Sequence, residues 1–212
     1  MRAAEEIIAP SLLLRAYASG IFPMAENAAD PRIQWIDPQR RGILPLDSFH
    51  VPRRLRRFMH HHPFDVRINT AFEEIVRLCA ESASDRPQTW INETILRSYC
   101  ALYALGFAHS VECWQDGVLV GGLYGVTLGG AFFGESMVSR APNASKVALV
   151  FLVNRLREKG YSLLDTQFIT EHLSQFGAIE VSRTDYHALL NVAIGQQNIT
   201  FGDTPGTSNT TL

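Results

Sequence analysis

The stretch HSVECWQDGVLVGGLYGVTLGGAFFGESM, residues 109–137, decides the fold of this chain. Its apolar runs are separated by Gln115-Asp116-Gly117 and by Gly129-Gly130, which are typical of tight hairpin turns. The sequence therefore predicts a meander of three antiparallel strands, at His109–Trp114, Val118–Leu128 and Ala131–Met137.

The segments that flank this meander alternate between helical and extended patterns. Helices are expected after N-caps at Asn69 and Asn92, and a longer one from about 144 to 159. A strand at Ser162–Phe168 follows, and then two short helices capped by Thr170 and by Ser182 or Thr184. Meander, helix, strand and helix is the order of an acetyltransferase-like layer. We therefore expect an α+β fold with a mixed sheet of the acetyltransferase (GNAT) type.

The N-terminal region has a different texture. Prolines recur at short intervals, at Pro10, Pro23, Pro31, Pro38, Pro45 and Pro52, which forbids long helices beyond the first. Ser11 is the expected N-cap of that helix, and Ile33–Ile36 and Gly42–Leu46 are expected to be short strands. The sequence predicts a small N-terminal α/β domain at 1–62 and a catalytic domain at 63–212.

Composition sets broad limits. The 212 residues are 46% hydrophobic and carry a formal net charge of -2, as in an ordinary globular protein. The three cysteines have no zinc-binding spacing, no segment has the pattern of a signal peptide, and no apolar run is long enough for a membrane span. We expect a cytoplasmic protein whose last residues, 206–212, are frayed.

Two polar residues share one predicted strand, in Leu164-Asp165-Thr166-Gln167. Because alternate residues of a strand share a face, Asp165 and Gln167 are expected to project together. A carboxylate and an amide side by side at the end of a core strand are unusual without a functional role. The alternative is that both residues simply leave the sheet for the loop before Thr170, and the pattern alone leaves both interpretations open.

A second acidic residue, Glu135, lies within the apolar, glycine-flanked run Phe133-Gly134-Glu135-Ser136. An unpaired buried carboxylate is costly, so Glu135 needs a partner. An internal arginine such as Arg140 would serve, and so would a positively charged ligand.

Arginines are concentrated in one short region. Six of them occur between residues 40 and 57, at Arg40, Arg41, Arg53, Arg54, Arg56 and Arg57, in a chain that is acidic overall. Such a run is often only a solvated face, but its density favours an anionic partner with phosphates. Nearby aromatic residues such as Trp90 could stack on a base, although a single tryptophan usually packs in a core.

Several catalytic motifs are absent from the sequence: P-loop, GxGxxG, GxSxG and HExxH. The loop Ser139–Ser145 also lacks the pyrophosphate-binding pattern of acetyl-CoA enzymes. This absence argues against a CoA donor in spite of the predicted element order.

Seven segments, in order, resemble leucyl/phenylalanyl-tRNA–protein transferases. They are Leu12–Tyr17 with Gly20–Pro23, Trp90-Ile91, Gly106 with Ala108–Glu112, Gly121–Gly125, Phe133–Met137 with Ser139-Arg140, Asn143–Lys146 and Leu164–Gln167. The resemblance extends from about residue 10 to residue 192. It implies transfer of Leu or Phe, and less readily Met, from aminoacyl-tRNA to proteins with N-terminal Arg or Lys. The product would be an N-end rule degradation signal, and the enzyme would need no metal or cofactor.

The resemblance also implies roles for individual residues. Asp165 and Gln167 match the catalytic pair, and Glu135 matches the residue that meets the acceptor. The residues that match the aminoacyl side-chain pocket are Leu123, Phe132, Met137, Leu149, Leu152 and Leu164. Trp90 matches an aromatic residue beside the terminal adenosine, as does Met24, where the family commonly has Trp. The six arginines match a tRNA-binding surface.

Two other functions compete with this interpretation. An acetyl-CoA-type N-acyltransferase would fit the element order, and CoA would stabilise it against heat. A non-catalytic tRNA-binding module would fit the arginines, and it would bind tRNA without transfer. We expect a monomer, because no heptad repeat or large apolar stripe indicates a partner.

Overall fold

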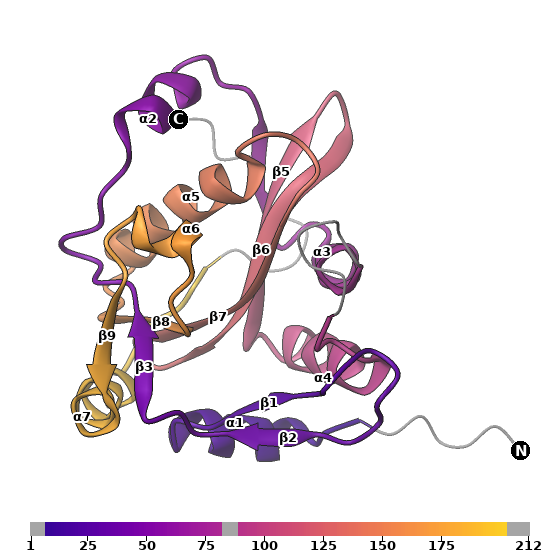
Figure 1. The fold of residues 1–212 in the computed structure, drawn as a ribbon, viewed down its shortest axis with the longest axis vertical. Helices are drawn as coiled ribbons and strands as arrows, with labels where there is room; N and C mark the ends of the chain where they lie inside the picture. The colour runs from indigo at the N-terminus through magenta and orange to yellow at the C-terminus, as the bar shows by residue number, and fades with distance from the viewer. Residues whose placement is uncertain (1–6, 82–88, 203–212) are drawn as a thin grey trace, which may run out of the picture.

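A mixed seven-stranded sheet forms the centre of the molecule in the computed structural model, which describes residues 7–81 and 89–202 (Figure 1). Its strands follow the order β4 (Asp65–Ile68), β5 (Ala108–Gln115), β6 (Val118–Leu128), β7 (Ala131–Ser139), β8 (Leu163–Gln167), β3 (Arg40–Ile43) and β9 (Ile179–Ser182). Strands β7 and β8 are parallel, whereas the other neighbouring pairs are antiparallel. The predicted α+β class with a mixed sheet is confirmed.

The predicted meander is β5–β6–β7, and both hairpin predictions are confirmed. Asp116 and Gly117 have φ angles of 52° and 76°, which is the backbone that a tight two-residue hairpin turn requires. At Gly129, φ is 55°, and a Cβ atom there would meet the carbonyl oxygen of Ile194 at 2.7 Å. The second turn therefore needs glycine both for its backbone angles and for its close approach to α7 (Arg183–Ile194).

Helices cover both faces of the sheet. Figure 1 shows α5 (Ala144–Glu158) and α3 (Phe72–Ala80) on opposite sides of the meander. Helices α1 (Pro10–Ala18), α4 (Glu93–Ala104) and α7 share one hydrophobic cluster with α3, while α2 (Arg53–Met59) and α6 (Glu171–Ser174) contribute to the cluster around α5. Consecutive strand residues are divided between the clusters, as in Leu123 and Tyr124, because alternate side chains point to opposite faces.

The N-terminal region is joined to the main sheet by β3. Before β3 the chain forms α1 and a separate two-stranded sheet of β1 (Phe22–Met24) and β2 (Gln34–Ile36). Strand β3 then pairs with both β8 and β9 in the seven-stranded sheet. Residues 7–62 therefore contribute one strand to the sheet, and the predicted domain boundary at residue 62 stays a prediction.

Three of the predicted helix N-caps are confirmed. The side chains of Asn92, Thr170 and Ser182 accept hydrogen bonds from the first turns of α4, α6 and α7. The prediction that Ser11 is the N-cap of α1 is wrong, because the helix begins at Pro10 and Ser11 lies inside it.

At α3, Asn69 is not the cap. The N-cap residue is Ala71, and no side chain makes a capping hydrogen bond there. Just before the helix, the buried Glu112 on β5 accepts hydrogen bonds from the backbone N–H groups of Thr70 and Ala71, at 2.9 and 3.0 Å. The sequence did not predict three of the strands, β1, β4 and β9. It also did not predict that the arginine run forms the helix α2. The tail at 206–212 lies outside the described residues. None of the helices in 7–81 and 89–202 has the length and apolarity to cross a membrane.

Candidate active site

A cavity opens where strands β7 and β8 separate. The two parallel strands pair only from Ala131 with Leu163 to Phe133 with Asp165, although both continue further. The next residues, Gly134 to Met137 on β7 and Thr166 and Gln167 on β8, line a cavity of about 500 Å³. The cavity thus lies at the carboxyl ends of adjacent parallel strands, a common location of ligand sites in α/β sheets.

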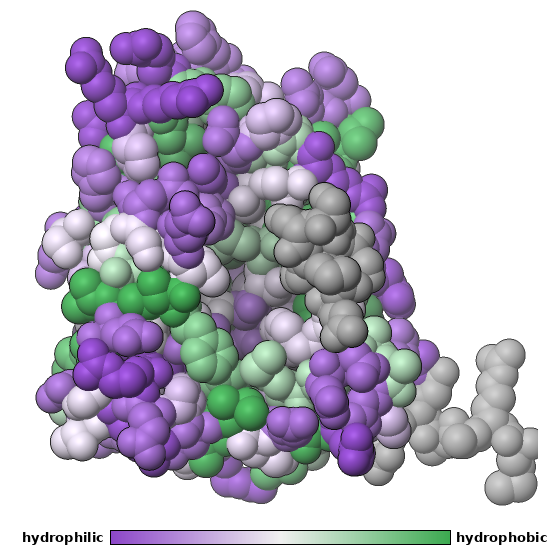
Figure 2. Space-filling model, viewed as in Figure 1, coloured by the Kyte–Doolittle hydropathy of each residue, from purple (hydrophilic) through white to green (hydrophobic). Residues whose placement is uncertain are grey.

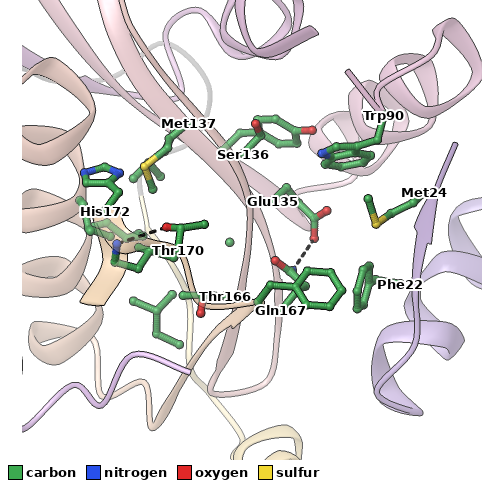
Figure 3. A pocket seen from close by; sticks show the side chains of 18 residues that line it. Phe22, Met24, Trp90, Glu135, Ser136, Met137, Thr166, Gln167, Thr170 and His172 are labelled. Carbon is green, nitrogen blue, oxygen red and sulfur yellow. Dashed lines mark hydrogen bonds between the residues drawn. The ribbon is translucent and has the colours of Figure 1, made fainter. Parts of the chain in front are cut away.

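The cavity has an aliphatic side and an aromatic side. Figure 3 shows Met137 and His172 at one end and Phe22, Met24 and Trp90 at the other, with Glu135 and Gln167 between them. The aliphatic side belongs to the hydrophobic cluster around α5, and its lining residues include Leu123, Leu149, Leu152, Leu164 and Leu173. The aromatic side belongs to the cluster on the other face of the sheet. One cavity therefore connects two separate hydrophobic regions.

Glu135 enters the cavity from a β-bulge. On β6, Tyr124 pairs with Ser136 and Gly125 pairs with Gly134, so Glu135 is the extra residue on β7. A bulge bends the strand and redirects a side chain, and bulges are common beside active sites. A Cβ atom on Gly125 would lie 2.3 Å from the carbonyl oxygen of Phe133, so the bulge also requires this glycine.

Two tyrosines hold the Glu135 carboxyl group. The hydroxyl of Tyr17 on α1 donates to Oε1 at 2.7 Å, and that of Tyr99 on α4 donates to Oε2 at 2.7 Å. Burial raises the pKa of the Glu135 carboxyl to about 7, although the two hydrogen bonds favour the charged form. Arg140, which the sequence suggested as a partner of Glu135, pairs with Glu81 instead.

Asp165 is completely buried and fully paired. Arg41 donates to both carboxylate oxygens, from Nε at 2.9 Å and from Nη2 at 2.6 Å. Tyr186 on α7 donates to Oδ2 at 2.7 Å. The Arg41 guanidinium also stacks between the rings of Phe22 and Tyr186, at 4.6 and 4.5 Å from their centroids. Arg41 binds Asp165 through two N–H···O bonds and is flanked by two aromatic rings, so the ion pair is strong in this buried site.

Gln167 reaches the cavity through an unusual backbone conformation. Its φ is 56°, and the N–H of Phe168 donates to the carbonyl of Thr166 at 2.6 Å, which forms a γ-turn. A non-glycine residue at positive φ is strained, and such residues persist where their surroundings hold them. Here the holding group is Asp165, whose Oδ1 accepts the backbone N–H of Gln167 at 2.8 Å.

This geometry corrects the expected relation between Asp165 and Gln167. Asp165 binds the backbone of Gln167 rather than its amide, and Asp165 is not among the residues that line the cavity. The amide of Gln167 turns towards Glu135 instead, with Nε2 3.4 Å from Oε1. Gly42 on β3 makes room for the turn, since a Cβ atom there would lie 2.7 Å from the carbonyl carbon of Phe168.

Most of the other predicted site residues line the cavity, and one lies outside it. Five of the six expected pocket residues line the cavity, whereas Phe132 is buried outside the lining and packs against Phe201. Met24 and Trp90 both line the cavity. The sequence did not indicate Tyr17, Tyr99 or Tyr186, because only the folded chain brings them to the carboxylates.

The arginine run is split by the fold. Arg53, Arg54, Arg56 and Arg57 are exposed on α2, where Figure 2 shows a hydrophilic surface, and among the described residues none of them forms an ion pair. Arg40 is also exposed, and its Nε atom lies 3.5 Å from Oε2 of Glu180. The prediction that Arg41 belongs to a tRNA-binding surface is wrong. Its side chain is only 1% exposed, so it is not available to bind phosphates.

Two family models match this chain. The one described as "Leucyl/phenylalanyl-tRNA protein transferase" matches residues 43–191, and the one described as its N-terminal domain matches residues 7–39. A relative of the same name from Paramagnetospirillum magneticum is 60% identical over 185 residues, which is 87% of this chain and 88% of the relative. Another from Rhizorhabdus wittichii is 58% identical over 188 residues, which is 89% of this chain and 76% of the relative.

Among solved structures the similarity is much weaker. The structure titled "The structure of L-PGS from Bacillus licheniformis" covers 75% of this chain and 66% of its own, at 11% identity and a TM-score of 0.46. This score is too low to establish a shared fold.

The sequence matches define the class of the protein, an enzyme that transfers an amino acid from aminoacyl-tRNA to a protein. The chain belongs to the leucyl/phenylalanyl-tRNA–protein transferase family. Aminoacyl-tRNA and a protein are therefore its two kinds of substrate.

The buried pairing of Arg41 predicts a large effect on stability. Arg41→Met leaves the Asp165 carboxylate buried without its countercharge, so we expect the free energy of unfolding to fall by about 3–5 kcal/mol. The matched control is Arg40→Met, which removes an exposed pair with Glu180 and should cost less than about 1 kcal/mol. Urea unfolding of both variants measures the difference, and equal losses would contradict this account of Arg41.

Proposed function

We propose that this enzyme transfers Leu or Phe, and less readily Met, to the α-amine of proteins that begin with Arg or Lys. The product would carry an N-end rule degradation signal. One observation supports this function above the others: a single cavity has an aliphatic side and an aromatic side, with Glu135 and Gln167 between them. The 3′ end of a charged tRNA has the matching parts, because an apolar side chain and an adenosine flank the reactive ester.

The aliphatic side suits the transferred amino acid. Its leucines and Met137 have flexible, unbranched Cβ positions, and they present an apolar surface to Leu, Phe or Met. Ile and Val carry a branch at Cβ and fit less well. A misfit of this kind is worth only roughly 1–3 kcal/mol, so discrimination among apolar amino acids is expected to be incomplete.

The aromatic side suits the terminal adenosine. Trp90 and Met24 line it, and Phe22 and Phe168 line it as well. A base stacked on an aromatic ring gains about 1–3 kcal/mol. Phe168 is 47% exposed at the cavity, so its ring can offset the loss of stacking where Met24 replaces the Trp that is common in the family.

The remaining parts of the proposal follow from the same geometry. The exposed arginines of α2 would bind tRNA phosphates, and Glu135 would attract the basic N-terminal residue of the acceptor. The element order supports an acetyltransferase-like catalytic domain at 63–212 beside a small domain at 1–62. We propose a cytoplasmic monomer that works without a cofactor.

The reaction requires positioning more than activation. The ester of aminoacyl-tRNA is already reactive, and the neutral α-amine of the acceptor attacks its carbonyl through a tetrahedral intermediate. The solution pKa of an α-amine is about 7.7–8, so the neutral form is readily available. The Gln167 carbonyl oxygen would orient the amine, and Asp165 would act through the backbone by holding Gln167 in its γ-turn.

The acceptor rule gives the first test of this function. Labelled Phe-tRNA is incubated with a peptide that begins with Arg and with the same peptide beginning with Ala. At a low peptide concentration we expect transfer to the Arg peptide only, because the Ala peptide has no cation for the Glu135 carboxylate and therefore binds more weakly. Absence of transfer to both peptides, with folded enzyme and intact Phe-tRNA, would contradict the function. Stabilisation by CoA would then favour an N-acyltransferase.

The α2 surface predicts salt-dependent tRNA binding. Each arginine that neutralises a phosphate contributes about 0.7–0.9 to the slope of log K against log salt concentration. The double variant Arg53→Ala/Arg57→Ala is therefore expected to bind tRNA more weakly and to reduce the slope by about 1–2. Arg77→Ala, an exposed arginine paired with Glu73 on α3, serves as the control and should leave the slope unchanged. An unchanged slope in the double variant would place the tRNA elsewhere.

A further inference from the structure

Gln167 alone leaves the chemistry incomplete, because a primary amide is too weakly basic to take a proton at neutral pH. Asp165 is unsuitable as well, since Arg41, Tyr186 and the Gln167 backbone already occupy its oxygens and it does not line the cavity. Of the described residues that do line the cavity, the acidic one is Glu135. His172 lies at the Met137 end, away from Gln167 (Figure 3).

Glu135 belongs to a ring of three oxygen contacts that has room for one more proton. Tyr17 and Tyr99 each lie 2.7 Å from one carboxyl oxygen, and their own hydroxyl oxygens lie 2.6 Å apart. When Glu135 is ionised, the two hydroxyl protons supply only two of these three contacts. A proton on the carboxyl group supplies the third, because Glu135 can then donate to Tyr17, Tyr17 to Tyr99, and Tyr99 to Glu135.

The carboxyl group is also accessible to an incoming amine. The contact between Gln167 Nε2 and Glu135 Oε1 is 3.4 Å, which is longer than the usual 2.7–3.2 Å of an N–H···O hydrogen bond. A substrate N–H can displace it at little cost. An amine in this position lies beside both Gln167 and Glu135, at the centre of the cavity in Figure 3.

We propose that Glu135 is the general base that accepts the proton of the attacking α-amine. This inference rests on the proposed function and adds the route of the proton. The amine nitrogen forms a C–N bond to the ester carbonyl carbon, and its proton passes to a carboxylate oxygen of Glu135. Collapse of the tetrahedral intermediate breaks the C–O bond, and the departing ribose oxygen takes that proton and restores the carboxylate.

The surroundings of Glu135 suit this role. The groups that act on it are Tyr17 on α1, Tyr99 on α4, Asp165 on β8 and Arg41 on β3, while Tyr124 on β6 and His172 on α6 also line the cavity. Burial raises the pKa of the Glu135 carboxyl to about 7, and the charge of Asp165 acts in the same direction. A base whose pKa lies near the working pH is ionised in about half of the molecules and is still basic enough to take a proton.

The proposed base predicts the shape of the pH profile. The productive complex contains an ionised Glu135 and a neutral amine, so two protons must leave before transfer. At pH values well below 7, the log of the single-turnover rate with saturating substrates should rise with a slope near two. In Glu135→Gln only the amine titrates, and the slope should fall to one.

Two acceptor peptides separate the role of base from recognition of charge. One begins with Arg and the other with citrulline, which has a similar shape but no charge. If Glu135 is the base, Glu135→Gln lowers kcat by the same factor, about 10²–10⁴, for both peptides, while KM rises for the Arg peptide only. A loss of kcat confined to the Arg peptide, or an unchanged pH slope, would overturn the proposal.

A second variant keeps the proposal testable if Glu135→Gln does not fold. Tyr99→Phe keeps the carboxylate but breaks the ring, so kcat should fall about ten-fold or more for both peptides, consistent with loss of a hydrogen bond to a charged group. Unchanged kcat values would contradict the proposal. If wild-type enzyme fails to modify the Arg peptide at all, the proposed function fails rather than the assignment of the base.

Discussion

The buried pair of Arg41 and Asp165 is the interaction on which the site depends. It joins residues that are 124 positions apart in the sequence and ties β3, from the N-terminal region, to β8 in the sheet. The same carboxylate accepts the backbone N–H of Gln167 and so holds a strained γ-turn in place. A buried charge pair adds little stability by itself, but removing one partner leaves a buried charge. The pair therefore acts as a positioning device whose effect reaches the cavity through the backbone.

The cavity itself arises from two departures from regular strand geometry. The bulge at Glu135 and the γ-turn at Gln167 lie on strands that have just separated, and each turns a polar side chain into the gap. Regular strands would have left Gln167 on the face of Asp165, among the groups that surround Arg41. The irregular backbone instead brings a carboxyl group and an amide together between an aliphatic and an aromatic surface. In the proposed reaction these surfaces hold the two ends of the aminoacyl-adenosine, so that the ester lies beside both polar groups.

Local patterns predicted much of the fold, because hairpins and N-caps depend on neighbouring residues. The turns at Asp116-Gly117 and Gly129-Gly130 and the caps at Asn92, Thr170 and Ser182 are of this kind. Contacts between distant residues were not predictable. Arg41 has no local feature that separates it from the exposed arginines, and the carboxylate that binds the backbone just before α3 comes from Glu112 on β5. At the site, the sequence indicated Asp165, Gln167 and Glu135 as residues but not their partners, because these come from α1, α4, α7 and β3.

The central claim is that the γ-turn delivers the Gln167 amide to the reacting ester, and single-turnover transfer from Phe-tRNA to an Arg peptide tests it most directly. With both substrates saturating, we expect Gln167→Ala to lower the rate by about ten-fold or more, because the attacking amine loses the group that orients it. Thr166→Ala, at the preceding cavity residue, should retain the wild-type rate within a factor of about two, since its buried hydroxyl has no hydrogen-bond partner within residues 7–81 and 89–202. A wild-type rate in Gln167→Ala would contradict the account.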